Sequence, residues 1–111
     1  MSKQPEARFK ETVLKDLRTL PSSFWQKIQQ RAIRGTPDIL GCLNGIFIAI
    51  ELKKDQKARV TELQEWTLSQ IAIAGGFSVI AYPSNWDETF MYLKDLQIQQ
   101  QRLETKMKLS S

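Results

Sequence analysis

The chain has 111 residues, of which 41% are hydrophobic and 25% charged, which fits one small soluble domain, and its net charge of +4 mildly favours an anionic partner. It contains no histidine and one cysteine, Cys42, which excludes the usual zinc sites, an internal disulfide, and serine–histidine or cysteine–histidine catalysis. The longest uninterrupted apolar run, residues 46–50, is far too short to cross a bilayer, and no apolar signal segment precedes it, so we expect a cytoplasmic protein without membrane contact.

The first half of the chain predicts one helix and three strands. Over residues 5–20, apolar side chains recur at helical spacing between two prolines. Residues 24–30 alternate well enough for a strand. Residues 35–54 contain two short apolar strands joined by Asn44-Gly45, the strongest short-range hairpin signal, because a type I′ turn requires positive φ at both central positions.

The second half predicts a helix, a strand and a further helix. The first of these helices begins at Thr61 and ends at the Gly75-Gly76 pair. Residues 77–82 form an apolar strand stopped by proline, and Ser84 or Asn85 can cap the last helix.

This order of elements predicts an α/β fold with a small mixed sheet of about four strands flanked by helices. The hairpin strands are antiparallel, whereas a strand–helix–strand unit normally gives parallel strands through a right-handed crossover. Both faces of the hairpin are largely apolar, so we expect each face to be covered.

We place the domain at residues 1–96 and a polar, glutamine-rich helical extension or tail at residues 97–111. Leu93, Leu96, Leu103 and Met107 keep roughly seven-residue spacing that Gln100 interrupts, so this segment is either a fraying helix end or a dimer-forming coil.

Two acidic residues lie in hairpin segments that are otherwise suited to burial. Extending the register outward from the turn places Asp38 opposite Glu51, with Lys53 on the same face. Two carboxylates so placed near a dry sheet repel each other unless a cation lies between them, so one interpretation is a divalent metal site. The other is that both acids lie just beyond the core and that one pairs with Lys53.

The first helix favours the metal interpretation. At 100° per residue, Glu6 falls on the apolar stripe with Phe9, Val13 and Leu17, so we expect it to point inward beside the other acids. The alternative for Glu6 alone is a favourable interaction with the helix dipole in the first turn.

Several motifs together resemble a known nuclease family. Gly35-Thr36-Pro37-Asp38, followed after twelve residues by Glu51-Leu52-Lys53, looks like the P-D...E-x-K signature of the restriction-endonuclease-like superfamily. Within it, the VRR-NUC family (virus-type replication-repair nucleases) is similar in four elements: Pro5-Glu6 with Lys10, the segment 35–53, Thr61-x-x-Gln64, and Gly75-Gly76 before a strand. The similarity covers about residues 5–82.

The resemblance implies a Mg²⁺- or Mn²⁺-dependent endodeoxyribonuclease. Asp38 and Glu51 would bind the metal, with the backbone carbonyl of Leu52 as a further ligand and Glu6 completing the site. Lys53 would be the essential lysine, holding the attacking water and a phosphate oxygen electrostatically.

Gln64 has two open interpretations. It matches a family glutamine that lies close to this lysine and the scissile phosphate, and it also fits a helix capping box with Thr61.

Basic residues that could bind DNA phosphates cluster around the acids, although a solvated rim is the alternative. They are Lys10, Arg31, Arg34, Lys54, Lys57 and Arg59. No motif suited to reading bases is evident, so we expect selection of DNA by shape.

The resemblance also implies a homodimer acting on branched DNA, like a Holliday-junction resolvase, in phage or prokaryotic replication, repair or recombination. One site per chain cannot cut two strands at once, which favours a twofold pair. The alternatives are a noncatalytic DNA-binding subunit with the same fold, and a nicking or flap nuclease.

Overall fold

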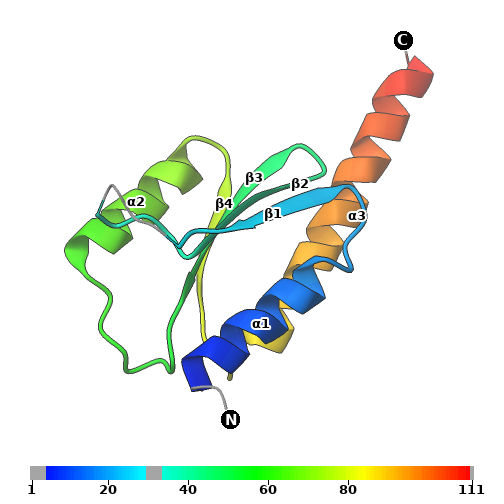
Figure 1. The fold of residues 1–111 in the computed structure, drawn as a ribbon. Coiled ribbons are helices and arrows are strands. Elements are labelled where there is room, and N and C mark those ends of the chain that lie inside the picture. The colour runs from blue at the N-terminus through cyan, green and yellow to red at the C-terminus, as the bar shows by residue number, and fades with distance from the viewer. Residues whose placement is uncertain (1–4, 30–33, 111) are drawn as a thin grey trace.

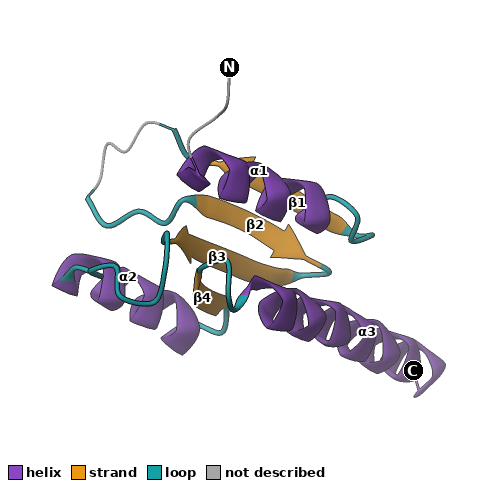
Figure 2. Cartoon of the chain, turned by 90° about the horizontal axis from the view of Figure 1, so that it is seen from below, coloured by secondary structure: helices purple, strands orange, loops and turns teal. Residues whose placement is uncertain are grey.

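A central sheet and three helices account for the described part of the chain, residues 5–29 and 34–110 of a computed structural model (Figures 1 and 2). The elements are α1 (Pro5–Leu17), β1 (Ser23–Lys27), β2 (Ile39–Leu43), β3 (Ile46–Leu52), α2 (Glu62–Ile73), β4 (Phe77–Ala81) and α3 (Trp86–Ser110). This order confirms the predicted α/β arrangement. None of the helices in these residues is long and apolar enough to cross a membrane.

The four strands lie in the order β1-β2-β3-β4, with β1, β2 and β3 antiparallel and β3 parallel to β4. The predicted mixed sheet is therefore confirmed. Asn44 and Gly45 at the tip of the hairpin have φ values of 48° and 91°, as a type I′ turn requires. The turn sets the predicted register, in which Leu43 faces Ile46 and Cys42 faces Phe47.

The core lies between one face of the sheet and helices α1 and α3, which share one side of the molecule in Figure 1. Trp25 of β1 packs over Gly41 of β2, where a Cβ would lie only 2.4 Å from the Trp25 ring. The Trp86 indole of α3 donates a 2.8 Å hydrogen bond to the Asp16 carboxylate of α1. The two helices are thus fixed to each other and to the sheet.

The opposite face is covered only in part, so the prediction that both faces are covered is wrong for this side. Helix α2 packs on β4, where the Ser78 hydroxyl donates a 2.7 Å hydrogen bond to the Leu68 carbonyl. No described helix lies over β1 and β2 here, and Phe24 and Phe47 stay 66% and 47% exposed. The apolar pattern of a strand does not specify whether a helix will cover it.

Helix α1 ends three residues before the predicted end at residue 20, and β1 begins one residue before the predicted start at residue 24. Helix α3 continues through the position where we placed the domain boundary. The Gln97 amide is buried and donates a 2.7 Å hydrogen bond to the Pro21 carbonyl, and beyond it the helix extends away from the body (Figure 1). The role of residues 97–111 stays a prediction.

The contact between Trp25 and Gly41 predicts a steric limit. Replacing Gly41 with Ala puts the Cβ 2.4 Å from both the Phe24 carbonyl oxygen and the Trp25 ring. We expect Gly41→Ala to lower the free energy of unfolding by about 1–3 kcal/mol, measured by urea denaturation. The control is Gln26→Ala at an exposed site of the same sheet, and an unchanged midpoint for Gly41→Ala would contradict this packing.

Candidate active site

Asp38, directly before β2, and Glu51, near the end of β3, lie at the end of the hairpin opposite its turn. The ladder pairs Ile39 with Ile50, and extending it by one residue places Asp38 opposite Glu51. Asp38 is 6% exposed and Glu51 is 2% exposed, in spite of their charges. Burying a carboxylate is costly unless hydrogen bonds or a cation stabilise it, so this pair marks a specialised position in the sheet.

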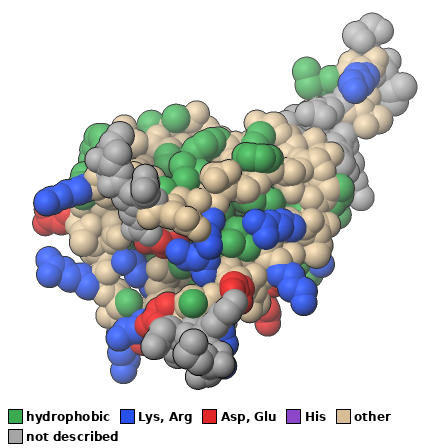
Figure 3. Space-filling view, in the orientation of Figure 1, with side chains coloured by type: hydrophobic (Ala, Val, Ile, Leu, Met, Phe, Trp, Pro, Cys, Tyr) green, Lys and Arg blue, Asp and Glu red, His purple; other side chains and the backbone are tan. Residues whose placement is uncertain are grey.

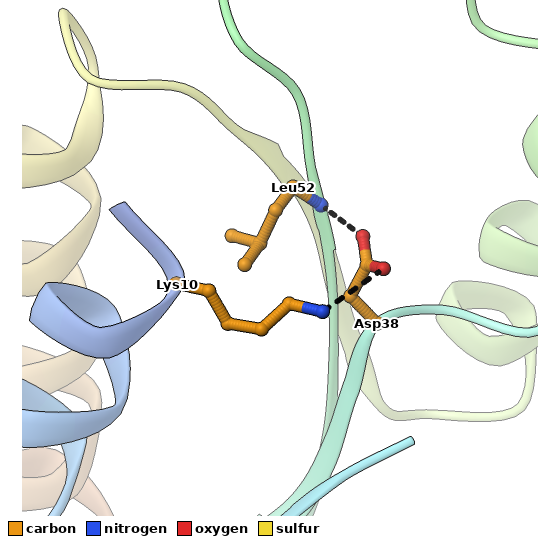
Figure 4. Close-up of polar contacts among 3 residues, drawn as sticks. All are labelled: Lys10, Asp38 and Leu52. Atoms are coloured by element: carbon orange, nitrogen blue, oxygen red, sulfur yellow. Dashed lines mark hydrogen bonds and ion pairs between the residues drawn. The ribbon is translucent and has the colours of Figure 1, made fainter. Parts of the chain in front are cut away.

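Asp38 is held by backbone groups on both sides. Its carbonyl accepts a 2.8 Å hydrogen bond from the Ile28 amide, and its Oδ2 accepts a 2.8 Å hydrogen bond from the Leu52 amide (Figure 4). The side chain therefore accepts a hydrogen bond from β3 at the point where the backbone pairing between β2 and β3 stops. This arrangement fixes the carboxylate relative to β3 and to the acid that precedes Leu52.

Helix α1 brings a cation to the same carboxylate. The Lys10 ammonium lies 3.9 Å from Oδ1 of Asp38 (Figure 4). Both residues line a pocket of about 130 Å³ together with Glu6, Leu52 and Lys53. The predicted motifs of the first helix and the hairpin thus meet in space, although they are far apart in sequence.

The expected inward orientation of Glu6 is wrong, because its side chain is exposed. The first turn of α1 lies before Phe9, the first of its residues packed against the core, so the apolar stripe does not bury Glu6. Glu6 does share the pocket with Asp38. However, no three acidic or cysteine side chains in the described residues are close enough together to hold a metal ion, so the expected cluster of three carboxylates is not formed.

Lys53 and Gln64 are joined by a hydrogen bond. The Lys53 ammonium donates to Oε1 of Gln64 at 3.1 Å, and the same oxygen accepts a 3.0 Å bond from the Thr61 amide. The backbone N–H of Gln64 in turn donates to the Thr61 hydroxyl at 3.1 Å, which completes a capping box at the start of α2. Both interpretations of Gln64, as helix cap and as neighbour of the lysine, are therefore satisfied by one side chain.

The lysine that the structure places beside Asp38 is Lys10 of α1. The sequence left open that Lys53 pairs with one of the two acids, without saying which. From the sequence, we expected Lys10 to bind DNA phosphates. The signal that could have identified it is its position one helical turn after Glu6, on the side of α1 that faces the hairpin.

The remaining basic candidates that the structure describes lie on the surface. Arg34, Lys54, Lys57 and Arg59 are exposed, and Lys54 also lines the pocket. Figure 3 shows Lys and Arg side chains next to acidic ones on the face that it draws. Arg31 lies outside the described residues.

The oxygen-rich donor set fits a hard cation. Asp38 and Glu51 offer carboxylate oxygens at the adjoining ends of β2 and β3, and the chain has no histidine. Mg²⁺, Ca²⁺ and Mn²⁺ prefer such ligands.

Sequence comparison finds no family model and no curated protein that matches the chain. Structural comparison finds a similar solved structure, described as a VRR_NUC domain. The two align with a TM-score of 0.65 and 20% sequence identity, over 78% of this chain and 94% of the other. At this identity the likeness is one of fold. The chain therefore has the fold of a VRR_NUC domain.

Proposed function

We propose that this protein belongs to the VRR-NUC family and is a metal-dependent endodeoxyribonuclease. The observation that carries the proposal is the pair of buried acids, Asp38 directly before β2 and Glu51 near the end of β3, with Lys53 directly after β3. A noncatalytic DNA-binding subunit would have no need to keep this complete set beside a basic surface.

The residues present suit Mg²⁺ or Mn²⁺. Asp38 and Glu51 would bind the ion directly, the carbonyl of Leu52 would add a ligand, and Glu6 would act from across the pocket. A divalent cation at this position supplies positive charge that lowers the pKa of water and offsets charge on the phosphate. The hydrogen bond from the Leu52 amide holds Asp38 in place for this role.

Lys53 provides a fixed positive charge next to the acids. An ammonium group has three hydrogens, and Gln64 accepts one of them at 3.1 Å. The others can donate to a nonbridging phosphate oxygen and to the attacking water. Lys53 would act by electrostatic stabilisation of the charge that develops on the phosphate.

The basic surface supports DNA as the substrate. Lys10 and Lys54 line the pocket, and Arg34, Lys57 and Arg59 are exposed in the segments that precede β2 and follow β3. We include Arg31 in this set from its sequence position. Contacts of this kind give salt-dependent binding without base recognition, which suits branched DNA such as a Holliday junction in phage or prokaryotic replication, repair or recombination, in the cytoplasm.

An uncharged aromatic surface supports a homodimer. Phe24, Cys42 and Phe47 lie side by side across three strands, and all three are exposed. Trp66 of α2, 60% exposed, joins Phe47 around a groove of about 370 Å³ whose described lining residues carry no charge. We call Phe24, Cys42, Phe47 and Trp66 the aromatic face.

A second copy of the chain fits the aromatic face better than DNA or a charged protein. Copies with a net charge of +4 repel each other except where they meet through neutral surfaces. Aromatic side chains bury roughly 150–250 Å² each, so this face offers several hundred Å² of apolar contact, about what the centre of an ~800 Å² half-interface contains. Twofold pairing would give two sites for a four-way junction.

The metal and lysine roles predict loss of cleavage without loss of folding. We expect Asp38→Asn and Lys53→Met to reduce cutting by about 100-fold or more in Mg²⁺ or Mn²⁺, because each removes charge that the transition state requires. The assay uses labelled four-way junction, fork, flap and linear duplex, with EDTA as the metal-free control. Asp55→Asn, in the exposed loop before α2, is the control variant. DNA binding without any metal-dependent cutting by the wild type would instead favour the noncatalytic subunit, and preference for the flap would favour a flap nuclease.

The shared oxygen of Gln64 predicts two separable effects. Thr61→Ala and Gln64→Ala each remove part of the capping box, and each should cost about 1 kcal/mol in urea denaturation. Only Gln64→Ala also removes the acceptor for Lys53, so only it should slow cleavage, by roughly tenfold. Equal cleavage rates in the two variants would show that Gln64 is a helix cap alone.

The aromatic face predicts a dimer that charge can disrupt. We expect the wild type to be dimeric by light scattering at micromolar concentration, and Phe24→Glu with Trp66→Glu to be monomeric, because four buried charges would face each other without partners. Tyr92→Glu, at a half-exposed position of α3 near the other face of the sheet, is the control that should remain dimeric. A monomeric wild type would refute this interface.

A further inference from the structure

The Lys10 side chain lies where a cation bound to Asp38 would lie. Its ammonium approaches Oδ1 at 3.9 Å, while Oδ2 is bound by the Leu52 amide (Figure 4). The oxygen that faces the pocket is therefore the one that Lys10 neutralises. Lys10 reaches it from α1, an element separate from the hairpin that carries both acids.

The charge around the pocket makes this contact a competitor for a metal ion. Lys10, Lys53 and Lys54 line the same small pocket, against the acids Asp38 and Glu6. A divalent ion entering beside Asp38 would be repelled by an ammonium group a few ångströms away, and like charges at this distance interact strongly even when solvent screens them. The ion and the ammonium group therefore cannot both occupy Oδ1 without a large cost.

Lys10 can move, whereas Asp38 cannot. The lysine side chain is 30% exposed and has a flexible four-carbon stem, while the Asp38 side chain is 8% exposed and fixed to β3 by a backbone hydrogen bond. When a cation binds, the lysine can swing into solvent without disturbing the sheet.

We propose that Lys10 is a positioning residue that pairs with Asp38 in the metal-free protein and is displaced when a divalent cation binds, so that it sets the metal affinity of the site. The inference rests on the proposed function, since it takes Asp38 as a metal ligand. In the absence of metal, Lys10 keeps the buried carboxylate neutralised. The contact also lowers the affinity for Mg²⁺ and Mn²⁺, because each binding event must first release the ammonium group.

The test is Mn²⁺ binding to the DNA-free protein, measured by isothermal titration calorimetry. Lys10→Met removes the competing charge and keeps most of the apolar stem, and we expect it to bind Mn²⁺ about tenfold more tightly than the wild type. Lys10→Arg keeps the charge and should retain low affinity. Lys15→Met, in the exposed last turn of α1, is the matched control and should bind as the wild type does.

The outcomes separate this inference from the proposed function. Asp38→Asn identifies which binding passes through the carboxylate. If the wild type binds Mn²⁺ through Asp38 but Lys10→Met binds no more tightly, or more weakly, the competition is refuted and the nuclease proposal stands. If neither the wild type nor Lys10→Met binds Mn²⁺, the metal site itself fails, and both proposals fall. Thermal melts in EDTA establish that Lys10→Met remains folded.

Discussion

The hydrogen bond from the Leu52 amide to the Asp38 carboxylate determines the geometry of the candidate site. It forms where β2 and β3 separate, so a side chain completes the pairing that the backbone no longer provides. The bond orients Asp38 toward β3 and thereby toward Glu51, the residue before its donor. If this bond were absent, a buried carboxylate at the end of a strand would have less to hold it near a second one.

The two helices at this end of the sheet complete the arrangement from separate directions. Helix α1 supplies Lys10 beside Asp38, and helix α2 supplies Gln64 beside Lys53. The acids and the lysine thus lie at or directly beside the ends of β2 and β3, while each helix contributes one side chain that contacts one of these charged groups. This division places a small polar pocket at the edge of an otherwise apolar core.

Local signals predicted most of the fold. The Asn44-Gly45 turn fixes the hairpin register by its backbone geometry, and the Thr61 and Gln64 pair marks the start of α2 through direct hydrogen bonds. Such features depend on residues a few positions apart, so the sequence specifies them well. The opposition of Asp38 and Glu51 followed from the same register.

The features that could not be predicted depend on packing between distant segments. The helical stripe placed Glu6 with the core residues but could not show that the first turn precedes the packed part of α1. The ion pair of Lys10 depends on where α1 crosses the end of the hairpin. Likewise, the exposure of Phe24 and Phe47 results from the position of α2 over only part of the sheet, which strand composition does not encode.

The side-chain oxygen of Gln64 at the start of α2 links the position of Lys53 to the local opening of this helix end. One oxygen of Gln64 receives both the Thr61 amide and the Lys53 ammonium, so when the first turn of α2 opens, the ammonium group loses its anchor as well. Amide hydrogen exchange at this helix end therefore reports how long the lysine is held in place. A ligand that immobilises the lysine must, by the same connection, slow that exchange.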